Sequence, residues 1–282
     1  MVADKTTTIT TENKFFRRFF KDGKGGDWMI DLHCHILPGI DDGAETLADS
    51  LDMAEKAISQ GITHILCTPH HKNGKYVNPK NEVIDKVAEL QEALDQRNLP
   101  LTLLEGQEVR ITGDLLEEIQ QDRILFTDLE DTYLLIEFPT MDVPAYAQEL
   151  FFKLREMGKV PVIVHPERNA KFREDPNRLI PFLEMGCLAQ LTAPSYIGVF
   201  GKDIQKTAKQ MVEHNLVQMM ASDAHGIKKR NFVMKEAFQQ IAHDYGGDKV
   251  AAMEQVAKDL INGDAVTFPE YTEIKKKRFG LF

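Results

Sequence analysis

The sequence predicts an α/β protein in which short parallel strands alternate with helices and close into a (β/α) barrel. Seven short apolar runs recur along the chain, and each is followed by helical periodicity or by residues that begin helices. The runs are nearly continuously apolar, as expected of strands that helices cover. A chain of 282 residues is long enough to close one large core, and one barrel fits it better than two open sheets.

The predicted elements follow one another regularly. Gly61 marks the end of the first helix, and Asn78 and Pro79 are expected as the cap and the first helical residue of the second. The expected strands span residues 28–33, 63–70, 101–109, 133–139, 160–166, 187–193 and 217–225, and the expected helices 45–61, 78–98, 143–158, 172–186 and 202–215.

The first 27 residues differ from the rest, so we expect an N-terminal extension (1–27), flexible or docking, before a single barrel domain (28–282). FFRRFF at 15–20 is either a helix that binds a membrane surface or a partner, or a frayed terminus whose aromatic residues pack on the domain or on a neighbouring subunit. The second interpretation is favoured. The same segment mildly favours a homo-oligomer, and the basic, aromatic tail KKKRFGLF has the same ambiguity.

Composition excludes several classes of protein. A formal net charge of −10 argues against nucleic-acid binding, although carboxylates around bound metal ions would inflate this count. No apolar run approaches the roughly 18 residues of a membrane span, and no secretory signal is apparent, which predicts a cytoplasmic protein. Cys34, Cys67 and Cys187 form no C-x-x-C pair and predict neither disulfides nor a thiolate zinc site.

Polar residues gather at the carboxyl ends of the predicted strands. In a parallel barrel these ends converge on one face, which brings together residues that are distant in the sequence. Side chains alternate along a strand, so the members of the pairs 33/35 and 223/225 point to the same side. The residues gathered in this way are His33, His35, His70, Glu108, Glu137, His165, Asp223 and His225.

This combination predicts a metal centre. A single strand-end histidine is more often structural, but five of the nine histidines occupy strand ends together with at least three carboxylates. Imidazole and carboxylate are the ligands preferred by Zn²⁺, Mn²⁺ and Fe rather than by Ca²⁺. Because so many ligands exceed the needs of one ion, we expect two or three ions bridged by a carboxylate.

These motifs resemble the PHP (polymerase and histidinol phosphatase) superfamily, and within it the bacterial manganese-dependent tyrosine-protein phosphatases of capsule and exopolysaccharide operons. The resemblance covers about residues 29–270, through DLHCHILPGIDDGA, CTPHH, EGQE, LIEFP, HPER and SDAHGIKKR. It implies a distorted (β/α)7 barrel with a trinuclear site. Mn²⁺ is the expected metal, with Fe or Zn²⁺ as alternatives.

The resemblance also implies roles for single residues. Asp42, directly before the glycine of the DDG turn, is favoured over Asp41 as a ligand. Arg168 and Arg230 match the phosphate-contacting arginines, and a guanidinium fork suits phosphate oxygens in any case, although a solvated Arg230 is the alternative in this basic loop. One ion would be held by His33, His35, Glu108 and Asp223, a second by Asp42, His70 and His225, and a third by Glu108, Glu137 and His165.

The function implied is hydrolysis of phosphotyrosine by metal-activated water, without a covalent enzyme intermediate. The phosphoprotein expected is a membrane tyrosine kinase that controls capsule or exopolysaccharide synthesis. None of the three cysteines is followed by the arginine of a C-x5-R motif, so thiolate catalysis is excluded. Two alternatives stay open: hydrolysis of small phosphate esters such as histidinol phosphate, and a metal-loaded regulatory protein without turnover.

Other polar and aromatic residues have weaker interpretations. His71 is a candidate general acid, with an exposed loop histidine as the favoured alternative. Tyr76 and Tyr196 are expected in loops near the site, where each either stacks on a substrate ring or packs locally. The remaining histidines, namely His64, His214 and His243, are expected to be structural.

Overall fold

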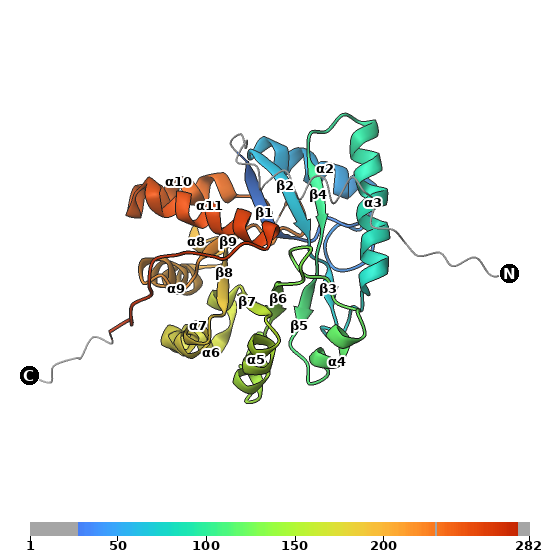
Figure 1. Cartoon of the computed structure of the whole chain (residues 1–282). Coiled ribbons are helices and arrows are strands. Elements are labelled where there is room, and N and C mark those ends of the chain that lie inside the picture. Colours follow the sequence, from blue (N-terminus) through green and yellow to red (C-terminus); the bar gives the residue numbers. More distant parts are fainter. Residues whose placement is uncertain (1–27, 229, 276–282) are drawn as a thin grey trace, which may run out of the picture.

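The computed structural model describes residues 28–228 and 230–275, and it contains parallel β-sheet with helices packed around it (Figure 1). One sheet has the strand order β1-β2-β4 and the other β3-β5-β6-β7-β8-β9. All of these strand pairs are parallel, which confirms the predicted α/β class. The strands are β1 (Met29–Cys34), β2 (Ile62–Cys67), β3 (His70–His71), β4 (Thr102–Glu105), β5 (Glu108–Arg110), β6 (Tyr133–Glu137), β7 (Val160–Val164), β8 (Leu188–Thr192) and β9 (Met219–Ala221).

Two predicted strands are each divided into two. The run 63–70 becomes β2 and β3, separated by Pro69, which has no N–H to continue the ladder. The run 101–109 becomes β4 and β5 around Gly106, where an added Cβ would lie 2.8 Å from the Leu66 side chain. Both breaks separate the same two sheets. A parallel bridge from Cys34 to Ala224 brings the end of β1 beside the segment after β9.

Helices lie around the strands (Figure 1). The first begins at a capping box formed by Thr46 and Asp49. Pro79 is the N-cap of α3, and Asn78 provides no cap, because its amide donates to the carbonyls of Ile40 and His70. The helices are α2 (Leu47–Ser59), α3 (Lys80–Gln96), α4 (Leu115–Gln120), α5 (Ala147–Glu156), α6 (Ala170–Glu174), α7 (Ile180–Glu184), α8 (Ala193–Tyr196), α9 (Lys202–Glu213), α10 (Met234–Tyr245) and α11 (Gly247–Asn262), with 3₁₀ turns η2 (Pro166–Arg168) and η3 (Pro176–Leu179).

Several of these features were not predicted, among them the short helices α4 and α8. The expected helix 172–186 is interrupted at Pro176 and consists of α6, η3 and α7. The helices α10 and α11 lie beyond the last expected element, and α11 packs on one face of the strands through Val256 and Leu260. That face also carries Tyr133 and Leu135 of β6. The alternation that buries these two residues also places Glu137, the last residue of β6, on the same face.

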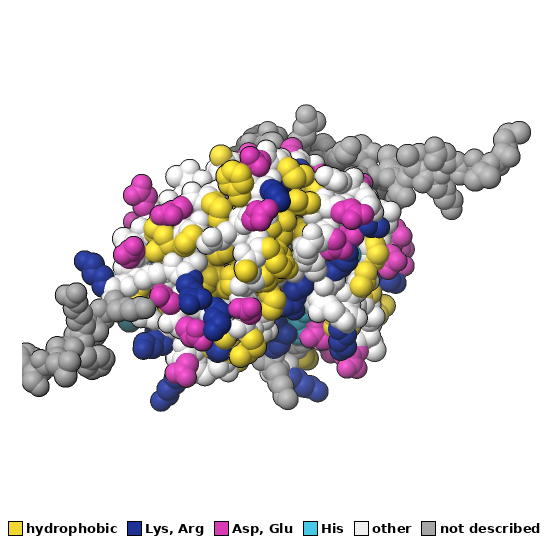
Figure 2. Space-filling view, turned by 90° about the horizontal axis from the view of Figure 1, so that it is seen from below, with side chains coloured by type: hydrophobic (Ala, Val, Ile, Leu, Met, Phe, Trp, Pro, Cys, Tyr) yellow, Lys and Arg dark blue, Asp and Glu magenta, His cyan; other side chains and the backbone are white. Residues whose placement is uncertain are grey.

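Charged side chains of both signs are interspersed on the face seen in Figure 2, with a band of hydrophobic side chains between them. This face therefore has no continuous basic surface of the kind that nucleic acid requires. No helix within 28–228 and 230–275 is long and apolar enough to span a membrane. The FFRRFF segment and most of the basic tail lie outside the described residues.

Candidate metal centre

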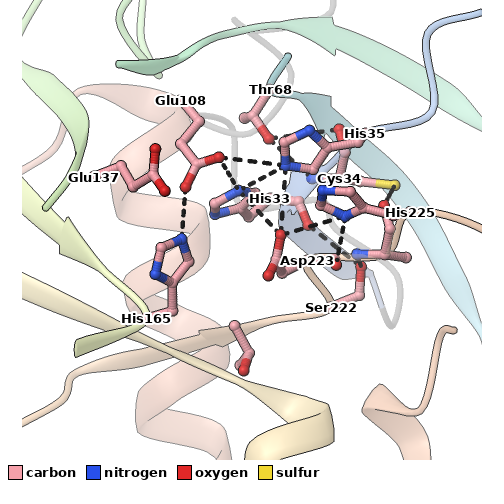
Figure 3. Close-up of polar contacts among 12 residues, drawn as sticks. His33, Cys34, His35, Thr68, Glu108, Glu137, His165, Ser222, Asp223 and His225 are labelled. Carbon is pink, nitrogen blue, oxygen red and sulfur yellow. Dashed lines mark hydrogen bonds and ion pairs between the residues drawn. The ribbon is translucent and has the colours of Figure 1, made fainter. Parts of the chain in front are cut away.

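The predicted strand-end residues lie together in one buried cluster (Figure 3). His33 comes from β1, His70 from β3, Glu108 from β5 and Glu137 from β6. The other members follow the ends of their strands within a few residues. The atoms able to bind metal form three groups, namely His35, Asp42, His70 and His225; His33, His35 and Glu108; and His70, Glu108 and Glu137.

His33 and His35 form one corner of the cluster. Their Nε2 atoms are 3.2 Å apart, and each lies 3.4–3.5 Å from Oε2 of Glu108. Each Nε2 is also 3.4 Å from Oδ1 of Asp223. Four ligand atoms arranged tetrahedrally about 2.1 Å from one ion would be roughly 3.4 Å apart. The separations of the two histidines from each other and from the two carboxylates therefore match the spacing of ligands around a single ion.

The two histidines are oriented by hydrogen bonds from their other ring nitrogens. Nδ1 of His35 is 2.7 Å from Oδ2 of Asp41, and Nδ1 of His33 is 3.0 Å from Oε1 of Gln190. Both partners accept, so Nδ1 carries the proton and the Nε2 lone pair faces the cluster. The sequence reasoning missed Gln190, although a glutamine in the apolar run of β8 was a visible signal.

The two aspartates of the Asp-Asp-Gly turn make different contacts. Asp41 uses its carboxylate on His35 and on the backbone N–H groups of Gly43 and His70. Asp42 instead directs Oδ1 to within 3.4 Å of His70 Nε2 and 3.5 Å of His225 Nε2. Gly43 has no room for a side chain, because an added Cβ would lie 2.0 Å from the carbonyl oxygen of His35.

Glu108 links the groups. Its Oε2 faces His33 and His35 and lies 2.7 Å from Nδ1 of His70, while Oε1 lies 2.6 Å from Nε2 of His165. His165 thus contacts Oε1 of Glu108, whereas the other three histidines around Glu108 contact Oε2. The group that contains Glu108 and Glu137 includes His70 in place of the expected His165.

Two cluster residues have a left-handed backbone. His165 has φ 38° and Asp223 has φ 51°, a conformation that is uncommon for residues other than glycine. Each directly follows or nearly follows the end of its strand, where the turn aims the side chain into the cluster. Such strain is typical of functional sites.

Burial and neighbouring charges set the protonation of the cluster. Burial opposes ionisation of Glu108, but the nearby imidazoles outweigh it and hold the pKa of this carboxyl well below its usual range. Burial and Arg168 lower the pKa of His165 to about 3, and burial and His35 lower that of His225 to about 4. Burial opposes protonation of His70 and His35, yet neighbouring carboxylates raise the pKa of His70 to about 9 and that of His35 well above its usual range. Metal binding requires neutral imidazole and ionised carboxylate, so a bound ion would displace protons from these two histidines.

Several buried atoms of the cluster have no hydrogen-bond partner among the described residues. Nδ1 of His70 and Oε2 of Glu108, for example, are 2.7 Å apart but are not aligned as a hydrogen bond. Buried polar atoms are rarely left unpaired, because desolvation without a partner costs about 1–3 kcal/mol. Carboxylate oxygens and imidazole nitrogens that point toward one another in this way, without hydrogen bonds, have the arrangement of ligands to divalent metal ions. The unpaired atoms are His70 Nδ1, Glu108 Oε2, Glu137 Oε2, Asp223 Oδ1 and His225 Nε2.

A cavity of about 320 Å³ opens onto the cluster. Arg168 and Arg230 both line it, and their guanidinium groups lie 2.7 and 2.6 Å from Oδ2 of Asp223. A third arginine in the same lining, Arg110, was missed by the sequence reasoning. It lies two residues after Glu108, so strand alternation already placed it on the same side.

The weaker candidates are separated by their surroundings. His71 is buried rather than exposed, and it points toward Glu118 because its strand neighbour His70 takes the cluster side. Tyr196 is fully buried and its hydroxyl donates to Asp244, so it packs locally. Tyr76 lies parallel to the His70 ring with 6.2 Å between centroids. The three cysteines are buried and form no disulfide.

The fold and the site together define an α/β protein with a candidate metal centre beside an arginine-lined cavity. The family model described as capsular polysaccharide synthesis, CpsB/CapC, matches residues 29–261, and the chain belongs to this family.

Named relatives agree with this assignment. The chain is 41% identical to the tyrosine-protein phosphatase YwqE of Bacillus subtilis over 256 residues, which cover 90% of this chain and 100% of YwqE. It is 35% identical to the putative tyrosine-protein phosphatase CapC of Staphylococcus aureus, again covering 90% and 100% of the two chains. A crystal structure from work on YwqE and on CpsB of Streptococcus pneumoniae, described as unique metal-dependent tyrosine phosphatases, matches with a TM-score of 0.84. It is 40% identical and covers 88% of this chain and all of its own.

Proposed function

We propose that this chain is a metal-dependent protein-tyrosine phosphatase. The observation that carries the proposal is the cluster of unpaired imidazole and carboxylate atoms beside a cavity lined by arginines. Membership of a family whose named relatives are tyrosine-protein phosphatases supports the choice of phosphotyrosine as substrate. The expected phosphoprotein is a tyrosine kinase of capsule or exopolysaccharide synthesis, and the expected compartment is the cytoplasm.

The proposed ligands are those of the three groups, with Asp223 and His165 added. His33, His35, Glu108 and Asp223 would hold one ion, Asp42, His70 and His225 a second, and Glu108, Glu137 and His165 a third. The direction of Asp42 Oδ1 toward His70 and His225 supports Asp42 as the ligand, because both oxygens of Asp41 already accept hydrogen bonds. Mn²⁺ is the metal we expect, with Fe or Zn²⁺ as alternatives.

When bound, such ions supply an activated water and neutralise the phosphoryl oxygens. The protein residues orient the reaction. Asp41 and Gln190 keep the Nε2 lone pairs of His35 and His33 directed at the cluster. Arg168 and Arg230 bind the equatorial phosphoryl oxygens, where negative charge accumulates. A phenolate leaves readily, so the burial of His71 away from the cavity removes no essential acid.

The finer fold proposal is a distorted (β/α)7 barrel formed by a single domain (28–282). If β2 with β3 and β4 with β5 are each one broken strand, the chain has seven strand units in order. The close approach of β1 to the segment after β9 supports closure of the barrel. Two hydrogen bonds between Asn177 and Ile274, one in each direction, and one from Tyr133 to Asp264 tie the segment after α11 to the same domain.

The test is phosphate release from a phosphotyrosine peptide by metal-stripped protein reconstituted with Mn²⁺. His33→Ala and Arg168→Ala should each lower activity by orders of magnitude, whereas the controls His243→Ala and Arg123→Ala, outside the cavity, should not. Histidinol phosphate is assayed in parallel. Turnover of histidinol phosphate alone would replace the proposal with a small-ester phosphatase, and metal binding without any turnover would favour a regulatory protein.

A further inference from the structure

Arg110 is a third arginine of the cavity, and it approaches from a different wall than Arg168 and Arg230. It ends β5 and is the direct cross-strand neighbour of Glu137, the last residue of β6. Its Nη2 lies 2.9 Å from Oε2 of Glu137. The other two arginines come from η2 and from the loop after β9, and both contact Asp223. Positive charge therefore enters the cavity beside two different carboxylates.

The guanidinium of Arg110 is only partly paired within the protein, through the ion pair of its Nη2 with Glu137. Its Nε is buried without a hydrogen-bond partner among the described residues, and its contact with Glu137 lacks hydrogen-bond alignment. Arg155, a structural arginine, differs: its Nε donates to the carbonyl of Met185 and its Nη1 to that of Lys159. A guanidinium that is four-fifths buried, with 19% of its side chain exposed, normally has acceptors. An acceptor from outside the chain would provide them.

The chemistry of that acceptor follows from the cavity. Arg110, Arg168 and Arg230 line one space of about 320 Å³, and the carboxylates in it are already directed at the metal cluster. A tetrahedral oxyanion presents oxygens in several directions, so it can accept hydrogen bonds from guanidinium groups on different walls. A carboxylate ligand, being planar, would satisfy only one wall.

We propose that Arg110 is a substrate-binding residue that donates to an oxygen of the phosphoryl group from the Glu137 side of the cavity. This inference rests on the proposed phosphatase function and adds a residue to it. Arg110 also balances the charge of Glu137, and the exposed fifth of its side chain, which lines the cavity, is the part that can reach substrate. Arg168 and Arg230 would then hold the opposite oxygens.

The test compares Arg110→Met and Arg110→Lys with the wild type, all loaded with Mn²⁺. Arg123→Met is the matched control, because Arg123 also pairs with a glutamate, Glu118 at 2.7 Å, but lies outside the cavity lining. Binding of radiolabelled inorganic phosphate is measured by equilibrium dialysis. KM and kcat are measured with a phosphotyrosine peptide, and metal content by elemental analysis.

We expect Arg110→Met to weaken phosphate binding and to raise KM by about 10- to 100-fold, with metal content unchanged and Arg123→Met equal to the wild type. Arg110→Lys should recover part of the loss, since it keeps the charge but not the fork. Phosphate affinity within twofold of wild type in Arg110→Met would overturn the inference, as would loss of metal from both Arg110 variants, which would make Arg110 a support for Glu137 only. Because phosphate binding is measured without turnover, failure of the phosphatase proposal would appear separately, as wild type that binds phosphate but does not hydrolyse the peptide.

Discussion

The chain around strand β6 buries one carboxylate before the strand and another at its end, and their surroundings are opposite. Asp128 accepts hydrogen bonds from the backbone N–H groups of Glu130, Thr132 and Tyr133. Glu137 is similarly buried, yet its Oε2 has no hydrogen-bond partner among the described residues. Burial and the charge of Glu108 raise the pKa of Glu137 to about 7. Burial of a carboxylate by itself therefore does not identify a site, whereas a buried carboxylate oxygen that lacks a hydrogen-bond partner points to one.

Among the substitutions, the largest loss of activity should come from changing Glu108, because its carboxylate contacts residues of all three ligand groups. Glu108→Gln retains the shape but supplies a weaker ligand, so metal content and phosphatase activity should fall by more than about 100-fold, beyond the typical loss for a residue that only supports a ligand. Elemental analysis and peptide hydrolysis measure both. If Glu108→Gln kept its metal and its activity, carboxylates without hydrogen-bond partners would not differ in role from a structural carboxylate such as Asp128.

A smaller loss of metal affinity is expected for a carboxylate that orients a histidine ligand and does not itself bind the metal. Asp41→Asn weakens the orientation of His35, whose Nδ1 is 2.7 Å from Asp41, and should lower metal affinity by about 10- to 100-fold. Titration of the metal-stripped protein with Mn²⁺ gives the affinity. If the loss equalled that of Glu108→Gln, Asp41 would itself be a ligand and Asp42 would not.

Asp128→Asn tests the carboxylate that has hydrogen-bond donors, whose role should be structural. The amide retains one acceptor oxygen and replaces the other with a donor, so part of the backbone N–H set loses its partner. We expect the free energy of unfolding to fall by about 1–3 kcal/mol, with kcat of the folded enzyme unchanged. Urea denaturation and peptide hydrolysis provide the two measurements, and a specific fall in kcat would contradict the structural role.

The smallest effect concerns His64, a buried histidine in β2 outside the cluster. Burial lowers its pKa to about 4, so the folded state keeps it neutral while the unfolded chain binds a proton below about pH 6.5. Protonation thus favours unfolding, and this stability is present above pH 6.5 and is lost as the pH falls toward 4, by up to about 3 kcal/mol.

The control is His64→Gln, which has no proton to bind. Between pH 7.5 and pH 5, the unfolding free energy of the wild type should fall more than that of His64→Gln. Cluster histidines titrate equally in both proteins and cancel. A difference that does not depend on pH would show that His64 titrates normally.

Much of the architecture was predictable because it is local. Runs such as 133–139 and 160–166 show their strand character directly, and the alternation within them predicts which polar residues share a face. The breaks at Pro69 and Gly106 were not predicted, since a strand region with one proline or glycine still looks continuous. The helices α10 and α11 were not predicted, because no strand lies between them and the alternation of strands and helices gives no position for a second helix.

The sequence by itself determined the kind of chemistry expected at the centre, because the number of imidazoles and carboxylates at strand ends already indicated a metal centre. Only the tertiary structure decided how they are paired: Asp42 rather than Asp41 beside His70 and His225, Glu108 between the groups, and Gln190 and Arg110 as added members. The reason is physical. Side-chain alternation depends on neighbouring residues, whereas the distance between two ligand atoms depends on strand register and on the turns that aim each side chain.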